Sequence, residues 1–154
     1  MDPAASLIAA LGLQPHPEGG HYAEVYRSPH TVLPDDGRPA RAALTTIDFL
    51  LAAGQFSAWH RVRSDEVWHL LEGDGLRLWL AAPDLGRFDS VELRPGARRR
   101  HVVPAHWWQA AEPLAQLAYV GATVGPGFDF ADFAFGRDDA ALRAALPAEL
   151  KRLL

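Results

Sequence analysis

A histidine and a glutamate, His60 and Glu66, are the side chains of this sequence whose types and spacing most favour chemistry. They lie on two apolar runs that are joined by a short polar corner. Alternation of side chains along a strand puts His60 on one face with Ala58 and Val62, and it puts Glu66 on one face with Trp68. If these faces meet, an imidazole and a carboxylate share an apolar interior, which is costly unless the two groups have partners.

Such a pair is suited to two kinds of site. His60 and Glu66 could ligate a divalent metal ion, because imidazole nitrogen and carboxylate oxygen are both common ligands. Alternatively, His60 could act as a general base while Glu66 holds its tautomer and stabilises its charged form. The structural alternative is a buried ion pair that only fixes strand register. We favour a site, because ion pairs are a poor way to stabilise a core.

Short strands must position this pair. We expect the corner at residues 63–65 to form a hairpin that returns the chain antiparallel. Many short strands with few helices between them predict an all-β body, either closed or built of two sheets. Helical spacing predicts a short helix at residues 3–11 and a helical tail at 138–154, which Asp138 or Asp139 would cap. The expected strands are 20–28, 41–51, 57–62, 66–70, 76–80, 88–93, 101–103, 107–111 and 114–124.

The spacing of Gly54, His60, Val62, Glu66 and Gly73 resembles the first motif of the cupin superfamily, with Val62 where that family carries a histidine. The second motif of the family is similar to the run from Gly96 to Gln109. In that run Gln109 takes a histidine position and His106 takes a glycine position. The resemblance covers about residues 40–125. It implies a metal site, of whose usual ligands this chain keeps His60 and Glu66.

Further phrases resemble a small single-domain cupin family whose members are mostly uncharacterised. They are Pro17-Glu18-Gly19-Gly20 with Tyr26-Arg27-Ser28 near the start, and Pro126-Gly127-Phe128-Asp129-Phe130 near the end. The resemblance implies a double-stranded β-helix, the jelly-roll barrel of the cupins, with a short N-terminal helix and a helical C-terminal tail. We expect one domain over 1–154, with the barrel at about 20–135. Residues 128–135 should cap one barrel end or pair with a second subunit.

The metal that this resemblance implies would be a divalent ion such as Zn, Ni, Mn or Fe. His60 and Glu66 stand in ligand positions, and Gln109 is a possible third ligand. No cofactor is certain on this basis, because Val62 and Gln109 replace imidazoles that bind first-row metals tightly. A set of histidine, glutamate, glutamine and water would hold a metal weakly.

Other side chains are candidates for contact with a ligand in the barrel. Trp68, on the face of Glu66, could stack on a sugar ring or another flat ligand. Tyr22 is our first candidate for a catalytic acid, with Tyr26 and Tyr119 as alternatives. Glu18 could bind a polar ligand or cap the backbone. His69 has the opposite parity to Glu66, so it faces the pocket only if a bulge reverses the alternation.

We expect an isomerase or epimerase that acts by proton transfer on a small carbohydrate-like substrate. This expectation uses an analogy, because some cupins are deoxysugar epimerases that use histidine and tyrosine without metal, and a fold alone does not fix a function. The alternative is a non-catalytic cupin that holds a small molecule as a sensor or store, with or without a weakly bound metal.

Composition narrows the classes of partner. The chain has 154 residues, of which 49% are hydrophobic and 22% charged, and its formal net charge is −4, so neither nucleic acid nor membrane is expected as a partner. It has no cysteine, which excludes disulfides and thiolate metal sites. The first residues lack the basic stretch of a signal peptide, so a cytoplasmic location is expected. An exposed edge strand would favour a homodimer.

Overall fold

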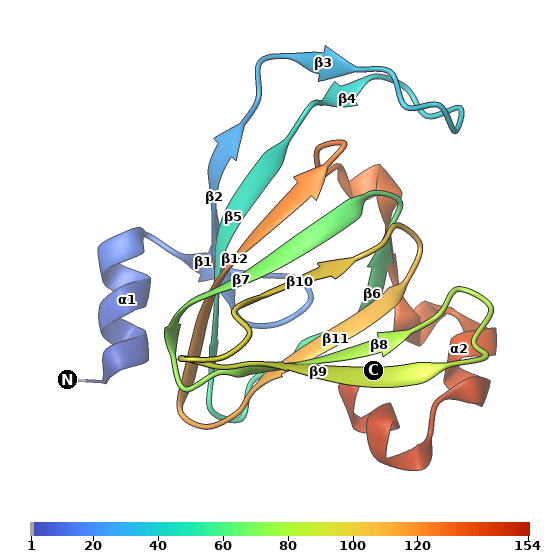
Figure 1. Cartoon of the computed structure of the whole chain (residues 1–154). Coiled ribbons are helices and arrows are strands. Elements are labelled where there is room, and N and C mark those ends of the chain that lie inside the picture. The colour runs from blue at the N-terminus through green and yellow to red at the C-terminus, as the bar shows by residue number, and fades with distance from the viewer. Residues whose placement is uncertain (1) are drawn as a thin grey trace.

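The protein is a two-sheet β-sandwich of the jelly-roll type, seen in a computed structural model that describes residues 2–154 (Figure 1). Neighbouring strands in both sheets run antiparallel. The six-stranded sheet has the order β1 (Gln14–Pro15), β2 (His21–Arg27), β5 (Thr45–Ala52), β12 (Leu117–Gly125), β7 (Asp65–Gly73), β10 (Arg100–Val103). The five-stranded sheet has the order β13 (Phe133–Phe135), β6 (Ser57–Val62), β11 (Trp108–Pro113), β8 (Leu76–Ala81), β9 (Phe88–Leu93).

The polar corner between β6 and β7 carries the chain from one sheet to the other. β6 pairs with β11 and β13, whereas β7 pairs with β12 and β10, so the expected hairpin is not formed. The prediction was wrong because alternation in two neighbouring runs cannot tell a hairpin from a crossover between packed sheets. As a result, His60 and Glu66 belong to sheets that face each other.

Three apolar clusters hold the layers together. The largest fills the space between the sheets, with Phe49, Trp68, Leu78 and Val120 among its buried members. The second lies on the outer face of the five-stranded sheet, where Trp59 and its neighbours pack under leucines of the C-terminal tail. The third joins the N-terminal helix to the outer face of the six-stranded sheet. Both sheets are therefore covered, at least in part, on two faces.

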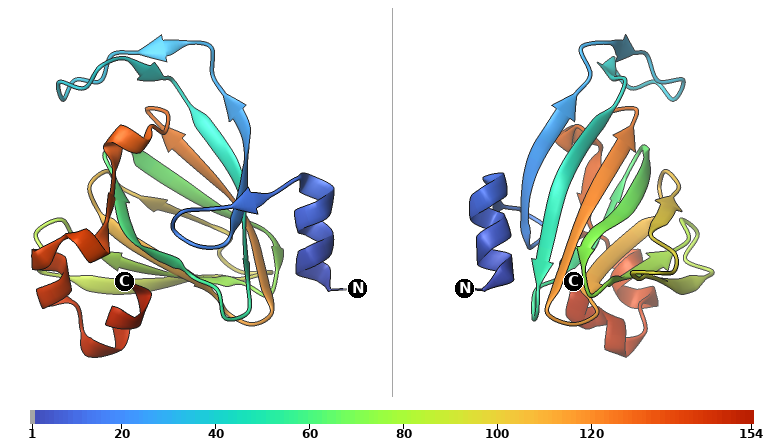
Figure 2. Two further views of the ribbon diagram at one scale, coloured as in Figure 1. Left: turned by 180° about the vertical axis from the view of Figure 1, so that it is seen from behind. Right: turned by 60° about the vertical axis from the view of Figure 1, so that its left-hand side comes forward.

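The two α-helices lie where the sequence predicts helix. α1 (Pro3–Leu11) is capped by Asp2 and ends at Gly12, which has a positive φ. Asp139 caps α2 through a hydrogen bond from the backbone N–H of Leu142. α1 and the C-terminal tail lie on opposite sides of the molecule (Figures 1 and 2). The tail contains α2 (Ala140–Ala145) and η3 (Ala148–Leu153). Before it, two short 3₁₀ helices, η1 (Phe130–Asp132) and η2 (Gly136–Asp138), lie on either side of β13. No helix within residues 2–154 has both the length and the apolar character needed to cross a membrane.

A small two-stranded sheet, β3 (Thr31–Val32) with β4 (Arg41–Ala42), extends beyond the end of the sandwich (Figure 2). A buried carboxylate, Asp132, fixes the chain around it by accepting hydrogen bonds from the guanidinium groups of Arg38 and Arg41, at 2.9–3.0 Å. The contacts join this hairpin to η1, which borders the open end of the barrel.

Candidate functional site

A cavity of about 400 Å³ opens at one end of the sandwich, beyond the part that the main apolar cluster fills. Both sheets, the loop before β2 and the segment around η1 contribute side chains to it. Its volume is in the range of small-molecule sites, which are about 300–1,000 Å³. The lining residues are His16, Glu18, Tyr22, Glu24, Arg27, Thr45, Ile47, His60, Val62, Glu66, Ala122, Val124, Phe128, Asp129, Phe130 and Phe133.

A β-bulge in β6 brings two polar side chains to the inner face of that strand. Gln109 pairs with His60 and Ala111 pairs with Ser57, so β6 has one residue more than β11 over this stretch. Because Gln109 and Ala111 have the same parity, both His60 and Ser57 point inward. Trp59 points outward into the cluster beneath the tail. The alternation of β6 predicted the orientation of His60, and the bulge adds Ser57.

The loop before β2 delivers Glu18 to the same place. The two glycines that follow it have positive φ angles, and a Cβ on Gly19 would overlap the carbonyl oxygen of Phe56. This close approach lets the Glu18 carbonyl accept a hydrogen bond from the Ala58 N–H at 2.8 Å. The loop is therefore pressed against β6, and its carboxyl group reaches the floor of the cavity.

The contacts of His60 define where its protons are. Nδ1 lies 2.7 Å from the carbonyl oxygen of Ala58, and a carbonyl can only accept, so Nδ1 carries a hydrogen. Nε2 lies 3.2 Å from Oε2 of Glu18, and the other oxygen of Glu18 accepts from the Ser57 hydroxyl at 2.7 Å. One proton therefore lies between Glu18 and His60, whichever of the two holds it.

Burial decides which partner holds that proton. The Glu18 side chain is only 8% exposed, and this burial raises its pKa to about 8 although the Ser57 hydroxyl opposes the shift. Burial also lowers the pKa of His60, although the nearby Glu66 carboxyl raises it in part. At neutral pH the favoured state is a protonated Glu18 that donates to a neutral imidazole.

Glu66 faces the cavity from the opposite sheet. Gln109 donates from its amide nitrogen to Oε1 of Glu66 at 2.8 Å, and its own oxygen accepts from the Trp68 indole at 2.8 Å. An indole N–H can only donate, so it fixes the orientation of the Gln109 amide. Burial, together with the charge of Glu18, raises the pKa of Glu66 to about 7, against the opposing effects of His60 and Gln109.

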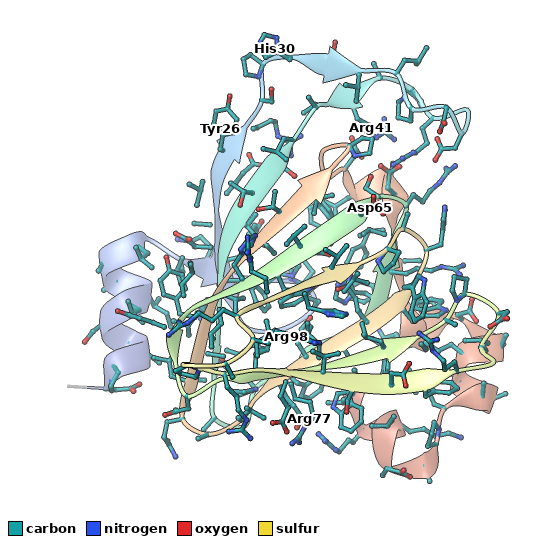
Figure 3. All side chains as sticks on the ribbon, in the orientation of Figure 1. Tyr26, His30, Arg41, Asp65, Arg77 and Arg98 are labelled. Carbon is teal, nitrogen blue, oxygen red and sulfur yellow. The ribbon has the colours of Figure 1, made fainter. Side chains whose placement is uncertain are left out.

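A second bulge, in β2, changes which side chains of that strand reach the cavity. Glu24 pairs with Ile47 and Tyr26 pairs with Thr46, so Val25 is the extra residue. Regular alternation would place Tyr22, Glu24 and Tyr26 on one face of β2. Tyr22 and Glu24 do line the cavity, but the third lining residue of β2 is Arg27 and not Tyr26. Tyr26 lies at the margin of the sheet and is 49% exposed (Figure 3).

Several candidates from the sequence lie outside the cavity lining. Tyr119 is on the outer face of the six-stranded sheet, where its hydroxyl donates to Asp48 at 2.9 Å, and burial with this bond raises its pKa to about 12. His69 has outward parity, as expected without a bulge, and lies in a surface groove beside β10. Trp68 is fully buried in the main core, so the structure places it behind Glu66 and not on a ligand face.

Other lining residues were not singled out by sequence reasoning. His16 lies at the cavity with its Nδ1 accepting from the Glu18 N–H at 3.0 Å, and burial and the nearby His60 lower its pKa to about 4. Phe133 of β13 stacks on the His60 ring, with centroids 5.3 Å apart. Their contacts are made by residues distant in sequence, and no local pattern signals them.

Three phenylalanines form an aromatic collar around the cavity: Phe128, Phe130 and Phe133. Their rings meet edge to face, with centroids 4.9–6.2 Å apart. Phe130 is 54% exposed, which is unusual for a large apolar side chain in a cluster. The prediction that residues 128–135 cap one barrel end is consistent with this position.

The comparisons with known proteins agree with this architecture. A family model described as the cupin superfamily (DUF985) matches residues 5–136. The chain belongs to the cupin superfamily. A hypothetical protein from Leishmania major is 31% identical to this cupin, with a TM-score of 0.88 and 97% of each chain covered. A protein from Shewanella oneidensis is 30% identical, with a TM-score of 0.84, and covers 100% of this chain and 98% of its own.

A more distant structural neighbour is a dTDP sugar isomerase from Desulfovibrio desulfuricans. It is 15% identical to this cupin, with a TM-score of 0.56, and the match covers 85% of this chain and 87% of that one. At this identity the likeness shows the fold alone. The comparison with curated proteins gave no match.

The donor atoms of this cupin do not fit the first-row metal ion that its fold implies. Nε2 of His60 faces Glu18, and Gln109 presents its amide nitrogen to Glu66 because its oxygen is bound to the Trp68 indole. Val62 lines the cavity with no donor atom. Within residues 2–154, no group of three or more histidine, aspartate or glutamate side chains is arranged to hold a metal. The groups available for chemistry in this cavity are therefore the side chains of the protein.

Proposed function

We propose that this cupin is an isomerase or epimerase that moves protons on a small carbohydrate-like molecule bound in the cavity. The observation that carries the proposal is the placement of two proton-exchanging groups on facing sheets. Glu66 is on β7, and the Glu18–His60 pair is held against β6. Both line one cavity, and the pKa values of the two carboxyl groups, about 7 and about 8, suit exchange near neutral pH.

The reaction follows from these protonation states. The Glu66 carboxylate removes a proton from a carbon beside the substrate carbonyl, and the C–H electron pair becomes the C=C bond of an enol. The proton shared by Glu18 and His60 moves to the carbonyl oxygen, which would otherwise carry the negative charge. For an isomer of a 2-hydroxycarbonyl compound, Glu66 returns its proton to the former carbonyl carbon. The hydroxyl on the neighbouring carbon gives its proton to the Glu18–His60 pair as it becomes the new carbonyl, so both groups regain their starting states. For an epimer, the enol hydroxyl returns its proton to the Glu18–His60 pair, the carbon takes up a proton from water on its opposite face, and Glu66 releases the removed proton to water.

This assignment differs from the roles that the sequence suggested. Sequence reasoning took His60 as the base, Glu66 as its orienting carboxylate and Tyr22 as the acid. In the structure the imidazole is oriented by Ala58 and Glu18, and Glu66 is supported from behind by Gln109. Tyr22 lines the cavity and packs edge to face against His16, so we assign it to substrate contact.

A cupin that binds its ligand without turnover is the second candidate. It is favoured by one contact: Nε2 of His60 is already engaged by Glu18, so the imidazole does not offer a free base to a ligand. The two functions differ in what happens to the carbon-bound hydrogens of a bound molecule.

Solvent deuterium uptake separates them. A thermal-shift screen of sugars, nucleotide sugars and organic acids would identify ligands, and NMR of each hit in D₂O would follow its C–H signals. The proposal is supported if a hydrogen on a carbon beside a carbonyl exchanges with deuterium in the wild type and this exchange is lost in the Glu66→Gln variant. A melting shift without exchange for every hit would leave the binding function instead. Exchange should survive dialysis against EDTA, because the groups that move protons belong to the protein.

A further inference from the structure

The charges around the cavity are unequal. Four carboxyl groups line it, those of Glu18, Glu24, Glu66 and Asp129, against a single guanidinium, that of Arg27, among the lining residues the structure describes. The two lining histidines add little positive charge, because burial lowers the pKa of both His16 and His60. Glu18 is protonated at neutral pH and Glu24 is paired with Arg27, so the negative charge of the lining lies on Asp129 and on the ionised form of Glu66. A ligand that carries phosphate or carboxylate would therefore meet these two carboxylates and no free cation among the lining residues.

The one guanidinium is already engaged. Nη2 of Arg27 donates to Oε1 of Glu24 at 2.7 Å and to the carbonyl oxygen of Phe128 at 3.1 Å. The Glu24 charge cancels that of Arg27, and the pair lies near the outer end of β2, where both side chains are well exposed to water. Arg27 therefore closes the β2 side of the opening and does not form an anion site.

One carboxyl oxygen at the cavity has no protein partner. Gln109 occupies Oε1 of Glu66, whereas Oε2 makes no hydrogen bond or ion pair with any residue in the range 2–154. The side chain is only 7% exposed. The carboxyl group is largely removed from bulk water and its second oxygen faces the cavity, so this oxygen is suited to a positively charged hydrogen-bond donor supplied by a ligand.

The donor set described above does not suit a metal ion, and the aromatic collar favours an organic skeleton. Phe128, Phe130 and Phe133 offer ring faces and edges at the cavity, beyond the buried carboxyl groups. Such rings pack well on the apolar faces of a compact ring and interact favourably with cations.

We infer that the ligand of this cavity carries a protonated amine, which pairs with Oε2 of Glu66 while its carbon skeleton packs on the aromatic collar. The inference rests on the proposed function only in taking this cavity as the ligand site. It narrows the ligand class to amine-bearing molecules. An ammonium on Oε2 occupies the oxygen that acts as base in the proposed reaction, because Gln109 holds Oε1, so the inference agrees with the second candidate function, binding without turnover.

Three probes of one shape and different charge test this inference. Benzylammonium, benzyl alcohol and benzoate share a ring that can lie on the collar, and they carry a positive, zero and negative charge. Each would be titrated into the ¹³C-methyl-labelled full chain at constant ionic strength and pH 7.5, with the methyl signals of Val62, Ala122 and Val124 as reporters of the cavity. Benzylammonium should bind at least about tenfold more tightly than benzoate, with benzyl alcohol between them.

The substitution Glu66→Gln should remove this preference, because the amide keeps the shape of the side chain and loses its charge. Glu149→Gln, an exposed change in η3, is the control and should leave the order of affinities unchanged. Benzoate binding as tightly as benzylammonium, the same order in Glu66→Gln, or no saturable shift at the reporters would each overturn the inference.

These outcomes are independent of the proposed reaction. If benzylammonium fails to bind but deuterium exchange is seen in another ligand, the charge inference is wrong and the isomerase proposal stands. If benzylammonium binds through Glu66 and no ligand, amine-bearing or other, exchanges a carbon-bound hydrogen with solvent, the charge inference stands and the isomerase proposal is wrong.

Discussion

Nε2 of His60 lies 3.2 Å from Oε2 of Glu18, and the two side chains come from a loop and a strand that are far apart in sequence. Each is buried, and each has its remaining polar atoms bound, His60 by Ala58 and Glu18 by Ser57. The pair therefore holds a proton in a fixed position beside a cavity, which a solvent-exposed pair could not do.

The pH dependence of stability should report this buried carboxyl. The pKa of Glu18 is about 8 in the folded protein against an ordinary value of 4.5, so the folded state binds the proton more tightly. This group therefore stabilises the fold at low pH, and its contribution is lost as pH rises from about 4.5 to about 8, by at most about 1.4 kcal/mol per pH unit.

The variant Glu18→Gln isolates this effect, because its amide mimics the protonated acid. The free energy of unfolding, measured by urea denaturation at pH 5, 6, 7 and 8, should fall in the wild type relative to the variant as pH rises. A difference that stays constant over this range would show that Glu18 is ionised in the fold at all these pH values.

Alternation along strands predicted much of this site, and bulges account for the clearest errors. His60, Val62 and Glu66 face the interior as their parity requires. Because β2 has an extra residue, Arg27 lines the cavity in place of Tyr26. The extra residue in β6 turns the Ser57 side chain inward. A bulge is decided by how strands pair, so a single strand's sequence does not reveal it.

Contacts between distant segments were also beyond sequence reasoning. The resemblance implied the jelly roll, and the fold confirms it, but it did not indicate that Gln109 would turn its nitrogen to Glu66. That orientation depends on the Trp68 indole, whose alternation indicated only that it shares a face with Glu66. Nor did any local pattern connect Glu18 to His60, because their contact depends on how a glycine-rich loop packs on β6.

The variant Glu66→Gln should lose proton transfer and keep its fold. The amide cannot accept a proton from carbon, so the rate of deuterium exchange should fall by about 10²–10⁴. His60→Ala should also abolish turnover, because it removes the partner that shares the Glu18 proton. NMR exchange rates, with circular dichroism as the check on folding, would measure both. Undiminished exchange in Glu66→Gln would exclude Glu66 as the base.

The indole that orients Gln109 should matter for stability. In Trp68→Phe the buried Gln109 oxygen loses its donor, and the free energy of unfolding should fall by about 1–3 kcal/mol. Trp79→Phe is the matched control, because Glu112 keeps its bonds to Arg152 when the Trp79 indole is lost. Equal losses in the two variants would mean that the removed ring area, and not the Gln109 bond, sets the cost.

Asp132 should be a large contributor to stability at the open end of the barrel. Its carboxylate is buried between Arg38 and Arg41, so Asp132→Asn removes the carboxylate partner of Arg41 and leaves Arg38 with the carboxylate of Asp36 alone, and it should cost about 3–5 kcal/mol. Asp89→Asn breaks an exposed pair with Arg87 and should cost less than about 1 kcal/mol. Urea denaturation of both variants measures the contrast, and a loss below about 1 kcal/mol for Asp132→Asn would contradict it.

The open edge of β2 predicts a homodimer. Within residues 2–154, β1 pairs only with His21 and Tyr22, so the outer backbone edge of Ala23 to Arg27 has no strand beside it. Val25 is 59% exposed on this edge, and a free edge with apolar side chains favours pairing with a second copy. Sedimentation equilibrium should give twice the chain mass for the wild type and the monomer mass for Val25→Lys, whose charge would be buried at such an interface. A wild-type chain that sediments only as a monomer at high protein concentration would exclude pairing through β2.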